Sequence, residues 1–298
     1  MIVGTGNVGA SFGYALVNQR TAVNELILVD VNQEDAEGEA MDLRDALAMA
    51  PGSLRIKSGT NADAGDCDII VITAGVPQQP GETRMDLLKK NAAIFKDMIK
   101  QIMDSGFDGI FVVVTNPMDV MTHLVWQYSN LPPERVIGSG TVLDSARLRQ
   151  QLARRIGVHP RSIHAYQIGE HGDSEFALWS SAFVGCQKIT DFIEAEELAR
   201  IEDLARKEAY AIIEKKGATF YGIGACLATI VHCILSDENR VLPVSNFDEY
   251  SGIFFGYPAV LGRQGVQRRL GPSLSEDEQQ KLNHSIDVIK QAVNEASS

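Results

Sequence analysis

Short apolar runs alternate with longer stretches of helical periodicity along the first half of the chain. The apolar runs predict buried strands at residues 1–3, 26–29, 68–73 and 110–114. Between them, apolar residues recur every three or four positions, which predicts helices at residues 8–19, 33–48, 85–104 and 117–128. The run at 69–72 is apolar on both faces, as a strand must be when helices cover both sides of its sheet. This alternation indicates parallel strands joined by crossover helices.

The second half has a mixed pattern. A further strand is expected at residues 135–137, and helices are expected at residues 142–156, 196–215, 224–236 and 276–296. The stretches at 241–245 and 253–257 have the composition of antiparallel strands. Without an internal repeat or a low-complexity linker, two lobes that share a cleft fit better than two independent domains. We predict a first domain at residues 1–140 and a second at residues 141–298.

Composition narrows the classes of partner. The net charge of −12 argues against binding to nucleic acid or to an acidic membrane, because both attract an excess of Lys and Arg. An anionic substrate would therefore be held by local arginines. The four cysteines show no metal-ligand spacing and are expected to be buried small hydrophobes in a reducing compartment. We see no signal peptide and no apolar run of the ~18–20 residues that a membrane span needs, so we expect a cytoplasmic protein.

A glycine loop follows the first predicted strand. Its three glycines, Gly4, Gly6 and Gly9, have the spacing of the dinucleotide fingerprint and open a helix. Asp30 ends the next strand, where a carboxylate can accept both ribose hydroxyls and would repel a 2'-phosphate. The pattern favours NAD over NADP, and an ordinary turn with a helix-capping Asp is the alternative. The fold class expected is α/β, a Rossmann-type doubly wound parallel sheet with a second α+β lobe for the substrate.

A single histidine, His171, lies between Glu170 and Gly172 just after the largely apolar run at residues 163–168. An imidazole in this position is backed by rigid structure and open to a small ligand. It can take a proton from an alcohol near physiological pH and return it. A histidine buried in the core is the alternative interpretation.

Five ordered blocks of sequence resemble the lactate/malate dehydrogenase family. They are GTGNVG at 4–9, AGVPQQPGETR at 74–84, TNP at 115–117, GSGTVLDSAR at 138–147 and GEHG at 169–172. The resemblance runs from Gly4 nearly to the C-terminus, and it implies the fold, an NAD cofactor, hydride transfer to a 2-oxo acid and a homotetramer. Family members usually carry several residues before this point, so we expect the first strand to be incomplete here.

The resemblance assigns roles to the matched residues. His171 would be the acid/base, Asp144 would bond to its other ring nitrogen, and Arg147 would hold the substrate carboxylate through two parallel bonds. Arg84 would polarise the reacting carbonyl from a closing loop, although composition alone favours a solvated arginine. The remaining matched positions are Asn116 and Thr219 for the substrate, and Val8, Gly75, Val76, Thr115, Asn116 and Ser139 for the cofactor. Their alternatives include an Asn-Pro turn at Asn116 and a helix N-cap at Thr219.

Gln78 decides between two substrates. Related malate dehydrogenases carry an arginine here to pair with the second carboxylate of oxaloacetate, whereas lactate dehydrogenases carry glutamine. A glutamine would leave that charge unpaired in a closing site, at a cost of several kcal/mol. We therefore expect pyruvate and L-lactate as the substrate pair. Malate or a longer-chain 2-hydroxy acid is the alternative, and a nucleotide-binding sensor without turnover is the rival from another class.

Two further cationic residues, Arg149 and His164, match positions that bind fructose 1,6-bisphosphate in responsive bacterial relatives. Arg149 lies two residues after Arg147, so on one helix it points away from the substrate side. The resemblance implies an effector site shared between subunits, and a surface arginine and histidine are the alternative. A metal site is not expected, because the six histidines are scattered without a ligand cluster.

Overall fold

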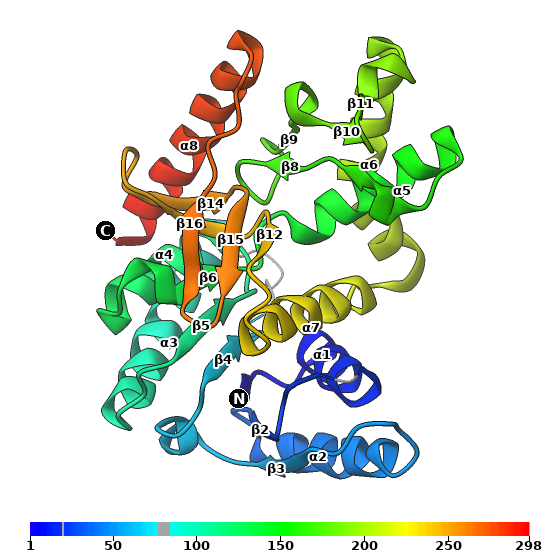
Figure 1. Cartoon of the computed structure of the whole chain (residues 1–298). Helices are drawn as coiled ribbons and strands as arrows, with labels where there is room; N and C mark the ends of the chain where they lie inside the picture. Colours follow the sequence, from blue (N-terminus) through cyan, green and yellow to red (C-terminus); the bar gives the residue numbers. More distant parts are fainter. Residues whose placement is uncertain (20, 77–83, 298) are drawn as a thin grey trace.

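The computed structural model describes residues 1–19, 21–76 and 84–297, and it is built around one eight-stranded sheet. The strands of this sheet are β1 Ile2–Val3, β2 Glu25–Val29, β3 Arg55–Ser58, β4 Ile69–Ile72, β5 Ile110–Val113, β6 Val136–Gly138, β13 Ser245–Asp248 and β14 Ile253–Gly256. They lie in the order β14-β13-β6-β5-β4-β1-β2-β3 (Figure 1). Strands β1 to β6 are parallel to one another and lie in the order β3-β2-β1-β4-β5-β6, which is the Rossmann arrangement.

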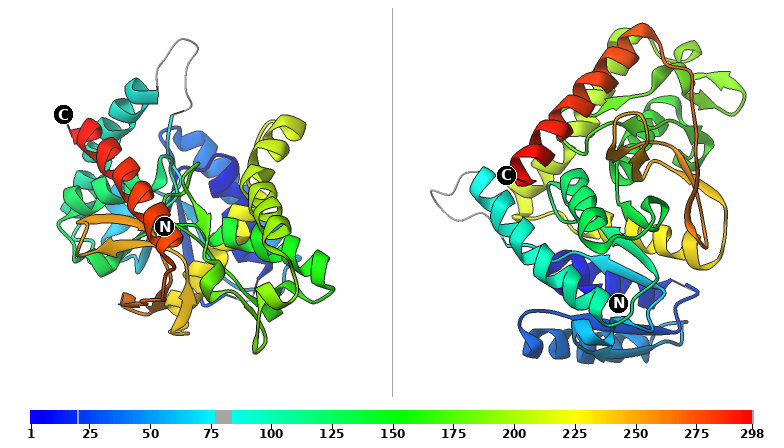
Figure 2. Two further views of the ribbon diagram at one scale, coloured as in Figure 1. Left: turned by 90° about the horizontal axis from the view of Figure 1, so that it is seen from above. Right: turned by 90° about the vertical axis from the view of Figure 1, so that its left-hand side faces the viewer.

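Helices cover both faces of this sheet. One face is covered by α1 Asn7–Asn18, α2 Gln33–Leu47 and α7 Tyr221–Leu235, and the other by α3 Arg84–Asp104, α4 Met118–Ser129 and α8 Glu276–Ser297. The two views of Figure 2 show these layers on either side of the strands. Each face has its own apolar cluster, and the four residues of β4 are all buried between them. The pattern of an apolar strand under two helical layers is thus confirmed, and so is the predicted fold class.

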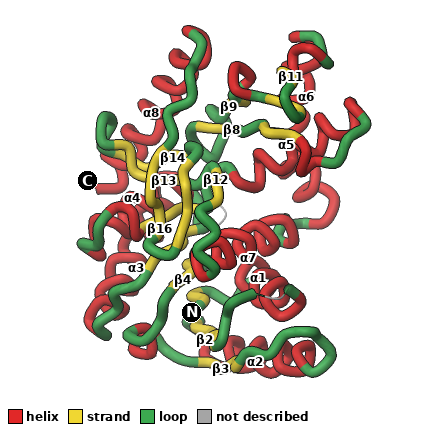
Figure 3. Tube along the Cα trace, in the orientation of Figure 1, coloured by secondary structure: helices red, strands yellow, loops and turns green. Residues whose placement is uncertain are grey.

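The second half of the chain also forms smaller units outside the central sheet. Helices α5 Val142–Ile156 and α6 Ala195–Lys216 enclose a third apolar cluster. The remaining strands are β7 Ile163–His164, β8 Gln167–Ile168, β9 Phe176–Ala177, β10 Phe183–Val184, β11 Gln187–Lys188, β12 Arg240–Leu242, β15 Ala259–Gly262 and β16 Gly265–Arg269. They pair in small antiparallel sheets. Figure 3 shows short strands in yellow among the loops and helices of this half. Short 3-10 turns lie at Asn61–Ala64, Pro133–Arg135, Pro160–Ser162, Trp179–Ser181 and Ile189–Asp191.

Several sequence expectations need correction. The strand expected at 241–245 is two strands, β12 and β13, in different sheets, because Pro243 between them cannot donate a ladder hydrogen bond. Strand β3 was not expected, since Arg55 and Lys57 are exposed and only Ile56 is buried within its polar sequence. The apolar run at 163–168 is likewise divided between β7 and β8. The domain boundary stays a prediction, but β13, from the second half, pairs with β6 of the first through Ser245 and Gly138.

The cysteines only partly follow the expectation of burial. All four are free; Cys233 is buried, Cys67 and Cys226 are partly buried, and Cys186 is exposed. Cys186 lies in the turn between β10 and β11, where no core covers it. Within the described part of the chain, no helix combines the length and the apolarity that crossing a membrane requires.

Candidate active site

His171 lies in the loop between β8 and β9, and its imidazole is paired with a carboxylate. Its Nδ1 is 2.8 Å from Oδ2 of Asp144, which is in the first turn of α5. Asp144 is buried, whereas the His171 side chain keeps 29% of its surface exposed. An ionised carboxylate can only accept a hydrogen bond, so Nδ1 carries the hydrogen and Nε2 remains available for proton exchange. The structure thus brings together the pair that the resemblance implied.

Arg147 extends the pair into a buried triad. It lies one helical turn after Asp144 on α5, and its Nη1 donates to Oδ1 of Asp144 at 2.8 Å. Both side chains are at most 7% exposed. The two oxygens of Asp144 are therefore divided between His171 and Arg147. This contact occupies one of the two terminal nitrogens of Arg147, and a carboxylate ligand would compete for or share the guanidinium.

The surroundings favour a protonated His171. Burial alone would lower the pKa of the imidazole, but the charge and hydrogen bond of Asp144 outweigh it and, with Glu175 and Asp119, raise the pKa to about 9. The same interaction acts on Asp144: burial opposes ionisation, and His171 and Arg147 overcome it and hold the pKa of the carboxyl below its usual value. At neutral pH, His171 is therefore protonated and Asp144 is ionised.

Sequence reasoning missed two buried acids beside His171. Oδ2 of Asp119 accepts a hydrogen bond from the backbone N–H of His171 at 2.7 Å, and Glu175 lies four residues after His171 with 4% exposure. Burial and the nearby charge of Asp144 raise the pKa of Glu175 well above its usual range. Asp119 follows the Asn116-Pro117 block closely, and its neighbours in the sequence do not distinguish it from an ordinary polar residue in the first turn of a helix. Glu175 lies just after the segment around His171, and only its position before the apolar residues 176–178 could have indicated burial.

The fold also creates a cluster that the sequence did not predict. Asp144, His171 and Glu175 place ligand atoms within 4.8 Å of one another. The expectation that no such cluster forms was therefore wrong, because residues from α5 and from the β8–β9 loop converge. The two oxygens of Asp144 are already engaged by His171 and Arg147, so the arrangement suits a shared proton better than an ion.

The glycine loop has the geometry that a dinucleotide needs. Gly4 has φ +99°, and a Cβ there would lie 2.4 Å from the backbone nitrogen of Ala74. A Cβ on Gly9 would lie 2.0 Å from the carbonyl oxygen of Gly4, so this glycine permits close packing of α1. A Cβ on Gly6, in contrast, meets no described atom within 4 Å. Packing within the described structure therefore does not require glycine at position 6. A ligand that approaches the backbone closely here would require it.

The N-terminus of α1 is also suited to binding an anion. Its N-cap is Gly6, no side chain caps it, and its first turn has no acidic residue. Free N–H groups and the helix dipole favour a phosphate there. Asp30 is tied to this loop, since one of its oxygens accepts from the backbone and hydroxyl of Thr5 at 2.7 and 3.1 Å. Its other oxygen accepts from the N–H of Asn32 at 3.2 Å, so the carboxylate is oriented at the carboxyl end of β2.

The other matched cofactor positions lie at the carboxyl ends of neighbouring strands. Gly75 and Val76 follow β4, Thr115 and Asn116 follow β5, and Ser139 follows β6. The Thr115 hydroxyl donates to the carbonyl of Ala74, which ties the first two of these strand ends together. Asn116 and Gly75 are exposed, Val8, Val76 and Thr115 are half-buried, and Ser139 is buried. This is the edge at which ligands bind in sheets of this kind.

Two predicted substrate residues cannot be placed. Gln78 lies outside the described residues, and of Arg84 only the backbone, at the start of α3, is described. Thr219 lies half-buried between α6 and α7 and does not cap α7, whose N-cap is Phe220. The N-cap alternative for Thr219 is therefore wrong.

The two predicted effector residues differ in burial. The Arg149 side chain is largely buried near Tyr166 and Arg240, and this burial lowers the pKa of its guanidinium. His164 is exposed on β7, opposite Phe183 of β10. The idea of a plain surface arginine at position 149 is thus incorrect.

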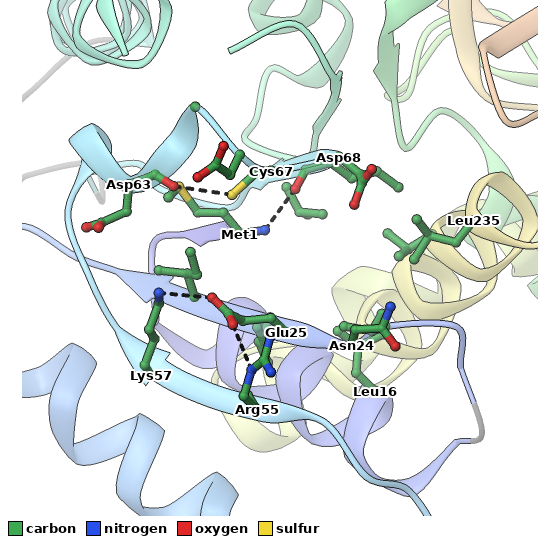
Figure 4. Close-up of a pocket in the computed structure, with 18 of the residues that line it drawn as sticks. Met1, Leu16, Asn24, Glu25, Arg55, Lys57, Asp63, Cys67, Asp68 and Leu235 are labelled. Carbon is green, nitrogen blue, oxygen red and sulfur yellow. Dashed lines mark hydrogen bonds and ion pairs between the residues drawn. The ribbon is translucent and has the colours of Figure 1, made fainter. Parts of the chain in front are cut away.

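A separate hollow lies away from His171. It has a volume of about 690 Å³ and opens beside Met1 at the amino ends of β1, β2 and β4 (Figure 4). Glu25, ion-paired to Arg55 and Lys57, forms one wall, and the Met1 ammonium donates to the carbonyl of Ile69. Ligands of such sheets bind at the carboxyl ends, so this hollow does not belong to the candidate active site.

Comparison with known proteins identifies the family of the chain. Residues 1–138 match the lactate/malate dehydrogenase NAD binding domain, and residues 141–298 match the alpha/beta C-terminal domain of the same family. L-lactate dehydrogenase 1 of Bacillus cereus and that of Bacillus anthracis are each 50% identical, over 98% of this chain and 96% of theirs.

Solved structures give the same result. A lactate dehydrogenase from a deep-sea metagenome library is 45% identical, with a TM-score of 0.97 over 100% of this chain and 98% of that one. The minor L-lactate dehydrogenase of Enterococcus mundtii, in its ligands-bound form, is 44% identical, with a TM-score of 0.94 over 98% of this chain and 96% of that one. The chain therefore belongs to the lactate/malate dehydrogenase family and is an NAD-dependent oxidoreductase.

Proposed function

We propose that the protein interconverts pyruvate and L-lactate. The observation that carries this proposal is the pairing of the His171 imidazole with Asp144 at 2.8 Å, next to the buried guanidinium of Arg147. A 2-oxo acid needs one group to exchange a proton with its oxygen and another to hold its carboxylate. His171 and Arg147 supply these two groups from adjacent positions. The relatives that share about half of the sequence carry the name L-lactate dehydrogenase.

The proton follows a defined route. NADH, which the glycine loop and Asp30 would hold, would supply the hydride that reduction of the pyruvate carbonyl needs. His171 gives the proton on Nε2 to the carbonyl oxygen, which becomes the hydroxyl of lactate, and Asp144 stabilises the ring in its correct tautomer throughout. In the reverse direction, neutral His171 accepts the hydroxyl proton. One hydride and one proton account for the two-electron reduction of the ketone.

The remaining predicted residues complete the site in this proposal. Arg147 binds the substrate carboxylate, Arg84 polarises the carbonyl when its loop closes, and Asn116 and Thr219 line the pocket. The residues that would hold the cofactor are Gly4, Gly6, Val8, Gly9 and Asp30, followed by Gly75, Val76, Thr115, Asn116 and Ser139. We keep the division into a cofactor domain at 1–140 and a catalytic domain at 141–298 as part of the same proposal.

Substrate choice provides the test. Gln78 cannot neutralise a second carboxylate, so kcat/KM should be higher for pyruvate than for oxaloacetate, and Gln78→Arg should move the preference towards oxaloacetate. Steady-state rates of NADH oxidation at 340 nm measure both. An equal or higher kcat/KM for oxaloacetate in the parent enzyme would reject pyruvate as the substrate.

Regulation by fructose 1,6-bisphosphate belongs to this proposal. Two features support it: Arg149 has no carboxylate partner among the described residues and lies near a second cation, Arg240, and His164 is exposed. Cationic groups from two subunits would offset the charge of the two phosphates. Pyruvate saturation curves with and without the effector test this point, and identical curves from pH 5 to 8 would reject it.

We also propose a cytoplasmic homotetramer. The exposed large apolar side chains include Tyr14 on α1, Leu204, Tyr210 and Ile213 on α6, and Tyr221 on α7. Such surfaces are typical of subunit contacts. Four free cysteines fit a reducing compartment. Light scattering at several protein concentrations measures the subunit number, and a monomer at all of them would contradict the assembly.

A further inference from the structure

Asp119 joins three parts of the molecule that are far apart in sequence. It lies in the first turn of α4 with 2% exposure. Its Oδ2 accepts the backbone N–H of His171 at 2.7 Å, and its Oδ1 accepts the hydroxyl of Ser245, on β13, at 2.5 Å. A buried carboxylate is costly unless it is well bonded, and here both of its oxygens are bonded to groups outside its own helix.

His171 is consequently held at two points. Asp144 holds the ring at Nδ1, and Asp119 holds the main chain from which the side chain extends. Ser245 is itself anchored, because it pairs with Gly138 of β6 in the central sheet. The position of Nε2 therefore depends on the sheet through Ser245 and Asp119, as well as on α5 through Asp144.

We propose that Asp119 is a positioning residue for the reaction. Its carboxylate sets the location of His171 through the backbone N–H, and its negative charge supports the imidazolium that donates the proton. This inference rests on the proposed function of His171 as the acid/base. It adds a residue that no sequence motif indicated.

The charge around His171 comes from several elements. Asp144 on α5 contributes most to the raised pKa of the imidazole, followed by Glu175 from the loop before β9 and Asp119 on α4. Arg147 on α5 lowers the pKa of Asp144 and, together with Arg206 on α6, that of Glu175. Glu170, from the same loop as His171, raises the pKa of Asp119. Burial raises the pKa of Asp119 to about 6, although the bonds from Ser245 and His171 favour its ionised form. Near neutral pH it is therefore largely charged, and it loses this charge at acidic pH.

Replacing the charge while keeping the bonds separates the two parts of the role. In Asp119→Asn the amide oxygen can still accept from the N–H of His171, and the amide nitrogen can donate to Ser245, whose hydroxyl can accept. We expect the pKa of His171 to fall by about half a unit to one unit. This shift is measured by NMR titration of the imidazole in the NAD-free enzyme, with the His171 signal assigned by its loss in His171→Gln. The alkaline fall of kcat/KM for pyruvate reduction should move to lower pH by the same amount.

Removing the bonds as well should affect turnover. In Asp119→Ala we expect kcat for pyruvate reduction to fall about 10- to 100-fold, with a change in KM of less than about threefold because Arg147 is untouched. Ser285→Ala is the matched control for a loosened loop: its hydroxyl oxygen accepts the N–H of Glu170 at 2.6 Å and carries no charge. It should reduce kcat without moving the pKa of His171. Asp66→Asn, an exposed acid near the amino ends of the strands, controls for loss of one charge and should change neither quantity.

The outcomes are distinct. A His171 pKa that is unchanged in Asp119→Asn, together with less than a twofold change of kcat in Asp119→Ala, would overturn the inference. Should Asp119→Ala fail to fold, the pKa shift in Asp119→Asn still decides. If the parent enzyme does not reduce pyruvate, the proposed function fails, whereas the imidazole titration continues to test Asp119 by itself.

Discussion

The glycine loop and the loop that carries His171 are both short turns at strand ends, but they are built in different ways. The glycine loop takes its shape from the backbone of six consecutive residues, and its side-chain partners outside the loop are Asp30 and Thr73. The His171 loop is held by side chains from three distant helices: Asp119 on α4, Asp144 on α5 and Ser285 on α8. A site formed by consecutive backbone groups can be recognised in a sequence. A site formed by side chains that converge from distant elements can be recognised only once the fold is known.

The largest expected effect separates the two regions. His171→Gln should lower kcat for pyruvate reduction by about 10²- to 10⁴-fold, because no other described group replaces its proton exchange. Affinity for NADH should stay within about twofold, since the glycine loop is unaffected. Steady-state rates and fluorescence titration measure the two quantities. His284→Gln, at an exposed position, is the control, and a comparable loss of NADH binding in His171→Gln would show that the regions are not independent.

The next effect concerns the carboxylate side of the His171 site. Arg147→Lys keeps the charge but loses the planar pair of donors, so KM for pyruvate should rise roughly 10- to 100-fold, corresponding to about 1.5–3 kcal/mol. The fall in kcat should be smaller. Arg154→Lys, exposed on the same helix, should behave like the parent. If KM were unchanged while kcat fell, Arg147 would act on Asp144 and not on the substrate.

The glycine loop can itself be divided into structural and ligand-facing positions. Gly9→Ala places a methyl group against the Gly4 carbonyl and should reduce the free energy of unfolding by about 1–3 kcal/mol. Gly6→Ala meets no described atom, so stability should change by less than about 0.5 kcal/mol while NADH affinity falls about tenfold. Denaturant unfolding and NADH titration of the two variants measure the contrast. A loss of stability in Gly6→Ala equal to that in Gly9→Ala would contradict it.

The smallest effect is a pH dependence confined to the His171 site. Pyruvate reduction needs protonated His171, whose pKa is about 9, so kcat/KM should be level through neutral pH, halve near pH 9 and then fall about tenfold per unit. Lactate oxidation needs the neutral ring and should rise over the same interval. NADH affinity should not follow this curve. A midpoint near that of an ordinary histidine would show that Asp144 does not stabilise the imidazolium.

The two regions also differ in how far the sequence alone predicts them. Helix α5 was predicted at its observed bounds because its apolar positions repeat regularly, and the turn-length spacing of Asp144 and Arg147 correctly placed them on one face. Strand β3 was missed because only Ile56 of its residues is buried. Asp119 and Ser285 were missed for another reason. Nothing in their neighbouring residues distinguishes them from helix-surface polar groups, and only tertiary packing brings them to the loop.

Helix α7 has a consequence for how the two halves can exist. Its residues Leu227, Ile230, Val231 and Ile234 are buried in the same apolar cluster as Phe12 and Leu16 of α1 and the strands beneath them. A fragment ending at residue 140 would leave this surface bare to water, and such a fragment would aggregate instead of binding nucleotide. Nucleotide binding in this molecule is therefore inseparable from a helix encoded some eighty residues later, and recombination at the midpoint of the gene would have to preserve that contact.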